Sequence, residues 1–194
     1  MIVITNPNPI TNEINTIHSL FENGLELLHI RKPDFSEQEM KVFLSEIKLE
    51  YRNRLVLHSQ HFLAEEFGIH RIHFSENERN NPFRVSNPER VISTSTHSME
   101  DFNTLNNKFD YAFLSPIYPS ISKPDYISDI NHFEAIKKRT NFSTKLIALG
   151  GITSKNIQQT REAGFDDVAL LGTIWNSTNP LQNFKKCQQI ALSY

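Results

Sequence analysis

The feature that most constrains the fold is a repeated alternation of short apolar runs with longer segments of helical spacing. Eight runs have the length of a β-strand and are rich in Ile, Val and Leu, which is typical of strands buried on both faces of a sheet. These runs are Ile2–Thr5, Leu25–Arg31, Arg54–His58, Arg71–Phe74, Val91–Thr96, Tyr111–Ser115, Lys145–Leu149 and Asp167–Leu171. Such alternation predicts βαβ units with parallel strands.

The segments between the runs carry helix start signals. Ser36-x-x-Glu39 matches a capping box ahead of an apolar stripe, and Ser98-x-x-Asp101 resembles it. The weak unit spans residues 76–90, where an Asn-Asn-Pro sequence indicates a loop with at most one turn of helix.

Eight such units in a chain of 194 residues predict one domain, residues 1–194, folded as a compact closed (β/α)8 barrel, the TIM barrel. The alternative is an open doubly wound sheet. That fold usually carries G-x-G-x-x-G after its first strand, whereas Thr5 is followed here by Asn-Pro-Asn-Pro. The sequence therefore favours the closed α/β barrel.

Charge and cysteine content exclude several classes of protein. Lys plus Arg number 20 and Asp plus Glu number 22, so the net charge of −2 leaves no basic footprint for nucleic acid or an anionic membrane surface. No apolar run approaches the roughly 20 residues of a membrane-spanning helix. The single cysteine, Cys187, fits a reducing compartment. We expect a soluble cytoplasmic protein without nucleic-acid or membrane partners; the sequence carries no indication of its oligomeric state.

Polar residues gather where the predicted strands end. In a (β/α)8 barrel the C-terminal strand ends form one rim, which carries the active site. The residues at these ends are Arg31, His58, Ser59, Ser95, His97 and Ser115. The imidazole of His97 is able to move a proton near neutral pH, so His97 is a candidate acid/base.

Glycines mark the ends of the last two predicted strands. Gly150 and Gly151 follow one strand, and Leu171 with Gly172 ends the other, so these ends hold three of only six glycines. Glycine lets a backbone approach a bound group closely. The loops after strands seven and eight commonly hold a phosphate through backbone N–H groups. We interpret these residues as a phosphate site, with ordinary turn chemistry as the alternative.

A second anion-binding element is predicted in the loop after strand six. Ser120 and Ser122 supply hydroxyls and Lys123 supplies an ammonium group within four residues, on a segment stiffened by proline. This set suits the oxygens of a phosphate or diphosphate.

Two histidine pairs have the spacing i, i+3: His58 with His61, and His70 with His73. Neither pair has a cysteine or third ligand beside it in a zinc-like pattern. The spacing alone therefore does not predict a zinc site.

In order and spacing, several segments together resemble the thiamin-phosphate synthase/TenI family over nearly the whole chain. The matching segments are Leu28–Lys32, Leu55–His58, Ile72–Ser75, Ser95–His97, Tyr111–Pro119 with Lys123–Asp125, Ala148–Ile152 and Ala163–Asp166. The resemblance implies the same barrel. It also implies an enzyme of thiamin biosynthesis, a transferase that joins a hydroxymethylpyrimidine diphosphate to a thiazole phosphate and releases diphosphate with the help of Mg²⁺.

The resemblance also implies residue roles. Arg31 and Lys123 match diphosphate-binding residues, and Ser95 matches a serine on the pyrimidine side. Ser120 and Ser122 stand where the family has threonines near the thiazole phosphate. The backbone of Gly150, Gly151, Leu171 and Gly172 matches the cradle for that phosphate.

The chain departs from the family pattern on the pyrimidine and diphosphate side. The family's Q-x-R-x-K reads His29-Ile-Arg31-Lys32-Pro33, so a lysine is replaced by proline although Lys32 is adjacent. The family's Asn-Asp pair after strand three reads His58-Ser59, and its second metal aspartate falls at Glu78. Mg²⁺ prefers hard oxygen ligands, so the loss of one of two carboxylates should weaken its binding.

Two alternatives remain open at this point. One is a TenI-like thiazole tautomerase, an isomerase that needs no metal and in which His97 would be the acid/base. The other is a barrel that binds thiazole phosphate without catalysis. Retention of Arg31, Ser95, His97 and Lys123 argues against the second.

Overall fold

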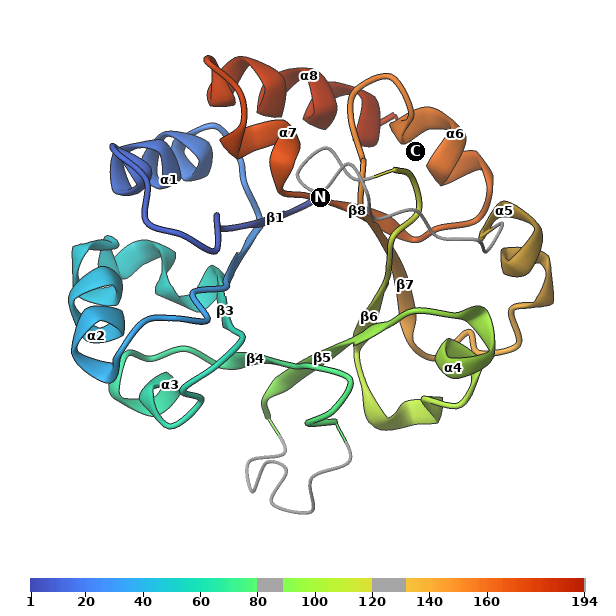
Figure 1. Cartoon of the computed structure of the whole chain (residues 1–194), viewed down its shortest axis with the longest axis horizontal. Helices are drawn as coiled ribbons and strands as arrows, with labels where there is room; N and C mark the ends of the chain where they lie inside the picture. The colour runs from blue at the N-terminus through green and yellow to red at the C-terminus, as the bar shows by residue number, and fades with distance from the viewer. Residues whose placement is uncertain (80–88, 120–131, 194) are drawn as a thin grey trace.

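The protein folds as a closed barrel of parallel strands surrounded by helices (Figure 1). The structure, a computed structural model, describes residues 1–79, 89–119 and 132–193. The strands are β1 (Ile2–Ile4), β2 (Leu27–Ile30), β3 (Leu55–Leu57), β4 (Arg71–Phe74), β5 (Val91–Thr96), β6 (Tyr111–Leu114), β7 (Lys145–Leu149) and β8 (Asp167–Leu170). Each strand pairs in parallel with the next, and β8 pairs with β1. The predicted (β/α)8 barrel and its eight strands are confirmed.

Helices follow the strands around the outside of the barrel. The α-helices are α1 (Glu13–Glu22), α2 (Glu37–Glu46), α3 (Leu63–Glu66), α4 (Met99–Asn103), α5 (His132–Ala135), α6 (Ile157–Glu162), α7 (Gly172–Trp175) and α8 (Pro180–Ala191). Short 3₁₀ helices are η1 (Leu49–Arg54), η2 (Asn106–Lys108) and η3 (Ile136–Lys138).

The predicted capping signals are present. At α2 the Ser36 hydroxyl accepts the Glu39 N–H, and the Glu39 carboxylate accepts the Ser36 N–H. At α4 the Ser98 hydroxyl accepts the N–H of Asp101. In the weak unit, residues 76–79 form turns and no helix, while residues 80–88 lie outside the described part of the chain.

Side chains alternate between the outer and inner faces of the barrel, as the two-residue period of a strand requires. The outward positions pack against the helices in one large apolar core, for example Leu28 and Ile30 of β2. A smaller inner cluster is formed by Ile2, Ile4, Tyr111, Phe113, Ile147 and Ala169. Because Leu28 and Ile30 point outward, His29 between them points into the barrel. The alternation therefore delivers a polar side chain to a buried interior.

Lys32 is fully buried although it carries an ammonium group. Its Nζ donates to the two carboxylate oxygens of Glu13 at 2.8 and 2.6 Å, and to the Asn8 carbonyl at 3.1 Å. The rings of Phe35 and Phe43 lie 5.4 and 5.2 Å from the same nitrogen. Pairing and hydrogen bonds offset the cost of burying this charge. Lys32 consequently ties the segment after β2 to the first turn of α1.

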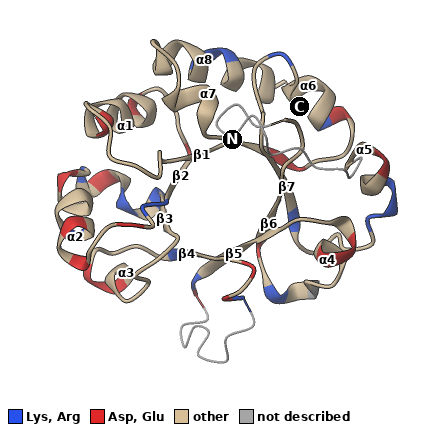
Figure 2. Ribbon diagram, in the orientation of Figure 1, with Lys and Arg blue, Asp and Glu red and all other residues tan. Residues whose placement is uncertain are grey.

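Charged residues of both signs lie on the outer ring of helices (Figure 2). Among the described helices, none combines the length and apolar character that crossing a membrane would need.

Candidate functional site

A cavity of about 1070 Å³ opens at the C-terminal ends of the strands. Of the residues proposed from sequence, the described ones that line it are Arg31, His58, Ser59, Ser95, His97, Ser115, Gly150, Gly151, Leu171 and Gly172. His29 lies beneath them and is fully buried. Ser120, Ser122 and Lys123 lie outside the described residues. The described rim residues therefore converge on one cavity, at the end of the barrel that the fold reserves for chemistry.

The ends of β7 and β8 meet side by side on one wall of this cavity. Leu149 pairs with Ala169 in the ladder, and the Thr173 hydroxyl donates to the Ile152 carbonyl in the next loop. Leu171 follows β8, and Gly172 then begins the short helix α7. The first N–H groups of a helix lack intrahelical partners, so this end presents donors to the cavity. The predicted juxtaposition of the two glycine-marked ends is present.

Gly150 and Gly151 are required by backbone packing as well as by any ligand. Their φ angles are +98° and +64°, in the left-handed region that favours glycine. A Cβ on Gly150 would lie 2.9 Å from Cα of Pro116, and one on Gly151 would lie 2.6 Å from the Pro119 carbonyl. The Tyr118 N–H donates to the Gly150 carbonyl at 3.2 Å. The start of the β6–α5 loop is thus pressed against the end of β7.

We expect Gly151→Ala to lower the free energy of unfolding by about 2–4 kcal/mol, because it adds an unfavourable φ to overpacking against Pro119. Gly68→Ala is the matched control: Gly68 has φ +66°, but its Cβ would meet nothing within 4 Å. The control should lose only the backbone cost, about 1–2 kcal/mol. Urea denaturation measures both. Equal losses in the two variants would contradict the close packing at Gly151.

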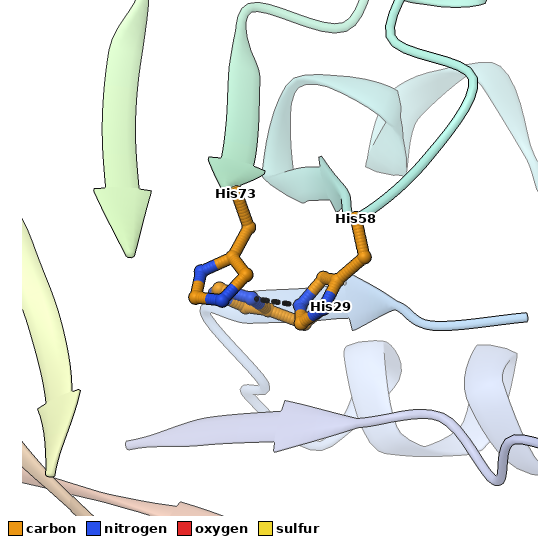
Figure 3. A group of neighbouring side chains, drawn as sticks. All are labelled: His29, His58 and His73. Atoms are coloured by element: carbon orange, nitrogen blue, oxygen red, sulfur yellow. Dashed lines mark hydrogen bonds between the residues drawn. The ribbon is translucent and has the colours of Figure 1, made fainter. Parts of the chain in front are cut away.

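Three histidines, from β2, the end of β3 and β4, meet at the floor of the cavity (Figure 3). His29 Nδ1 and His58 Nε2 share a hydrogen bond of 2.8 Å, and His29 Nε2 is 2.8 Å from the Tyr111 hydroxyl. His73 stacks on His58 with ring centroids 4.1 Å apart. Its Nδ1 and Nε2 lie 2.9 and 3.0 Å from the hydroxyls of Ser93 and Ser95. A connected polar network therefore crosses the interior from β2 to β6.

Burial holds this network in its neutral form. It lowers the pKa of His73 to about 3, and it takes the pKa values of His29 and His58 well below the usual range. Burial also raises the pKa of Tyr111 to about 12. At neutral pH the three imidazoles are uncharged and the phenol is protonated. The floor of the cavity is consequently polar without carrying charge.

Among the described residues that line the cavity, Arg31 is the only arginine or lysine. Its backbone is fixed by Thr5, whose hydroxyl accepts the Arg31 N–H at 2.8 Å and donates to the Arg31 carbonyl at 3.2 Å. Lys32 does not stand in for the lysine missing at Pro33, because its ammonium group points to Glu13 instead.

His97 sits at the mouth of the cavity with half of its side chain exposed. Its Nδ1 lies 2.8 Å from the Ser115 carbonyl, which fixes Nδ1–H as the donor, and Nε2 lies 3.8 Å from the Glu76 carboxylate. Glu76 lines the cavity. The Glu78 carboxylate instead accepts the Ser75 N–H and hydroxyl, at 3.1 and 2.6 Å.

Sequence reasoning missed Ser93, Tyr111 and Glu76, and it did not place His73 at the site. An available signal is a polar residue flanked by outward apolar ones, as in Ile72-His73-Phe74. Such a residue faces the interior of the barrel.

Comparison with known proteins identifies relatives of the whole chain. The family model described as thiamine monophosphate synthase matches residues 1–174. A thiamine-phosphate synthase of Koribacter versatilis is 30% identical over 162 residues, which are 80% of this chain and 76% of that protein. One from Flavobacterium johnsoniae is 24% identical over 186 residues, 90% of this chain and 87% of that one. The crystal structure of a thiamine phosphate pyrophosphorylase from Bacteroides thetaiotaomicron superposes with TM-score 0.81 and 32% identity, covering 98% of this chain and 96% of that chain.

Proposed function

This chain belongs to the thiamine monophosphate synthase family, and we propose that it is a transferase that joins hydroxymethylpyrimidine diphosphate to a thiazole phosphate. The products are thiamin phosphate and diphosphate. The observation that carries the proposal is the single cavity that combines Arg31 with the paired glycine ends of β7 and β8. We assign these two elements to two separate phosphoryl groups, because both substrates are phosphorylated.

Arg31 stabilises the leaving group. The C–O bond of the pyrimidine substrate breaks with its electron pair moving to diphosphate, and a pyrimidine-methyl cation remains. The guanidinium group offers planar donors to the oxygens on which charge develops. Because Thr5 fixes the backbone of Arg31, the side chain starts from an anchored position at the cavity wall.

The glycine ends position the nucleophile. We assign the thiazole phosphate to the backbone of Gly150, Gly151, Leu171 and Gly172, which line the cavity. Asn156 braces this wall: its side-chain amide donates to the Gly151 carbonyl at 2.9 Å and its oxygen accepts the Thr153 N–H at 2.8 Å. Anchoring the phosphate lets the thiazole nitrogen approach the cation and form the C–N bond with its lone pair. Alignment of this kind supplies much of the catalysis.

The neutral floor suits a reaction through a cation. His58, His73 and Ser95 line the cavity on the side that we assign to the pyrimidine, with His29 beneath. Protonated imidazoles would repel a developing carbocation, whereas uncharged ones offer lone pairs and hydrogen bonds. The burial that keeps these rings neutral thus serves the chemistry.

The described residues fit Mg²⁺ held largely by the substrate. Mg²⁺ commonly uses one or two carboxylates together with substrate phosphates and retains several waters. Glu76 supplies one carboxylate on the cavity wall, and Ser59 stands where a second acidic ligand is expected. Glu78 would have to leave Ser75 to join it. When bound, Mg²⁺ would neutralise charge on the diphosphate. Ser120, Ser122 and Lys123 remain proposed anion ligands in the part of the chain beyond the described residues.

The relatives named above are synthases, so neither a tautomerase nor a non-catalytic phosphate-binding barrel is favoured. The bond cleavage and bond formation of the condensation move no proton, so the acid/base role of His97 at the cavity mouth belongs to the tautomerase alternative. In the condensation His97 is proposed only as a polar residue of the cavity lining.

The test is a product assay with purified protein, both substrates and Mg²⁺, followed by chromatography. We expect thiamin phosphate and an equal amount of diphosphate, and their loss when EDTA is added. Parallel samples contain the thiazole carboxylate phosphate alone, to detect isomerisation. Isomerisation without condensation would overturn the proposal in favour of the tautomerase. If neither reaction occurs but thiazole phosphate raises the melting temperature, the protein is a binding module.

A further inference from the structure

The three interior histidines have the arrangement of a metal-binding set. Each of His29, His58 and His73 offers a ring nitrogen, and these three nitrogens lie within 4.8 Å of one another. Figure 3 shows the side chains converging from β2, the end of β3 and β4 toward a common point. The strand pairing brings them together across separations of 29 and 15 residues, so no short sequence motif marks the set.

The rings of His29 and His73 are buried. In each, one ring nitrogen keeps a hydrogen-bond partner from the protein when the other nitrogen binds a metal ion. With His29 Nδ1 facing His58, Nε2–H can donate to the Tyr111 hydroxyl at 2.8 Å. His73 has a serine hydroxyl at each nitrogen, Ser93 and Ser95, so either one can act as ligand while the other nitrogen retains its partner. Outer partners of this type orient the ligating imidazoles in metalloproteins.

We propose that His29, His58 and His73 form a binding site for a divalent transition metal ion of the zinc class at the floor of the cavity. A set of three imidazoles suits Zn²⁺, Co²⁺ or Ni²⁺, whereas Mg²⁺ prefers oxygen ligands. The site is therefore distinct in chemistry from any Mg²⁺ held by Glu76 and substrate oxygens. Three protein ligands leave a tetrahedral ion with one open position. Because His58 and His73 line the cavity, that position faces the cavity. A bound ion would replace the neutral floor by a positive one; the site is therefore one of the substrate-free protein, and a bound ion would oppose the condensation rather than assist it.

Binding requires tautomer exchange but no net loss of protons. Each neutral imidazole carries one ring proton and one lone pair. In the bound state His29 carries its proton on Nε2 and His58 carries its proton on Nδ1, which frees the two nitrogens that now share a hydrogen bond. Zinc–nitrogen bonds of about 2.0–2.1 Å place tetrahedral nitrogens about 3.3 Å apart. His29 Nδ1 and His58 Nε2, now 2.8 Å apart, therefore separate slightly on metal binding, while the ligating nitrogen of His73 moves closer to them.

The experiment measures metal affinity directly, without substrate. Tag-free protein is freed of metal with a chelator, and Zn²⁺ is titrated in competition with a chromogenic indicator; Co²⁺ is followed by its visible absorption. We expect one Zn²⁺ per chain, unaffected by excess Mg²⁺, and a Co²⁺ spectrum of low coordination number. Zn²⁺ should also raise the melting temperature of the wild-type protein.

Variants locate the site. Tyr111→Phe keeps the ring but removes an outer partner, so it should weaken Zn²⁺ binding by about 10–100-fold. His58→Ala and His73→Ala should weaken it further. His70→Ala is the matched control, because His70 is exposed just before β4, at the opposite end of the strand from the cavity; it should bind as the wild type does. Melting curves without metal identify variants that still unfold cooperatively, and Tyr111→Phe provides the test if the histidine variants do not.

Two results would overturn the site: an octahedral, water-like Co²⁺ spectrum, or equal loss of Zn²⁺ affinity in His70→Ala and His58→Ala. Neither result bears on the condensation reaction, since no substrate is present.

Discussion

Arg31→Gln lowers kcat/KM for thiamin phosphate formation by about 10²–10³-fold, the usual cost of removing one group that stabilises transition-state charge. Glutamine retains hydrogen-bonding capacity but loses the positive charge that faces the leaving diphosphate. Most of the loss should fall on kcat, because charge on the diphosphate increases as the C–O bond breaks. Steady-state kinetics with each substrate varied in turn measures the effect.

Arg71→Gln is the control for Arg31→Gln. Arg71 begins β4 at the opposite end of the barrel strands, and its Nε donates to the Asn53 carbonyl at 3.3 Å. This variant should keep kcat/KM within a few fold of the wild type. A similar loss in both variants would indicate a global effect of charge or folding and would remove Arg31 from the assigned role.

Acid destabilises the metal-free protein steeply below about pH 6.5. The pKa of His73 is lowered to about 3, and those of His29 and His58 lie well below 6.5, chiefly because the rings are buried. Unfolded histidines titrate near pH 6.5. Above that pH neither state binds these protons. Below it the unfolded state binds them and the folded state does not, so stability falls as the pH falls. His73, with its pKa near 3, contributes about 1.4 kcal/mol per pH unit, and His29 and His58 add to the slope in the same direction.

Neighbouring groups act in the same direction. After burial, which is the largest cause, His73 lowers the pKa values of His29 and His58, His61 and Arg31 lower that of His73, and Arg71 lowers that of His29. Urea denaturation with EDTA between pH 7.5 and 5, above the range of ordinary carboxylates, tests the prediction. His73→Gln should reduce the slope by about 1.4 kcal/mol per pH unit. If the free energy of unfolding stayed constant across this range, the folded cluster would bind protons as readily as the unfolded chain, which would contradict the prediction.

The barrel was predictable because its signals are local. Apolar runs such as Val91–Thr96 and Lys145–Leu149 coincide with strands, and the capping box at Ser36 and Glu39 forms as expected. Each of these patterns acts over a few residues, so it does not depend on the rest of the fold. The meeting of the glycine-marked ends could be predicted from the barrel itself, since parallel pairing of neighbouring strands brings the ends of β7 and β8 together.

The histidine network and the partner of Lys32 were not predictable in the same way. His29 meets Tyr111 across 82 residues, through the register of a closed sheet. From its position beside Arg31, Lys32 is expected to line the cavity. Its side chain instead points into the protein interior, where its ammonium group pairs with Glu13. Such outcomes depend on three-dimensional packing, which spacing along the chain does not encode. Alternation within strands indicates that His29 and His73 face inward, but not which partners they meet.

The contact between residues 116–119 and the end of β7 has a consequence for engineering. The Ile117 N–H donates to the Leu149 carbonyl at 3.0 Å, and no room for a Cβ is left at Gly150 or Gly151. A graft that exchanged one of these segments with a related barrel would leave the other mismatched in shape. The two must be transplanted together, as a single interchangeable module.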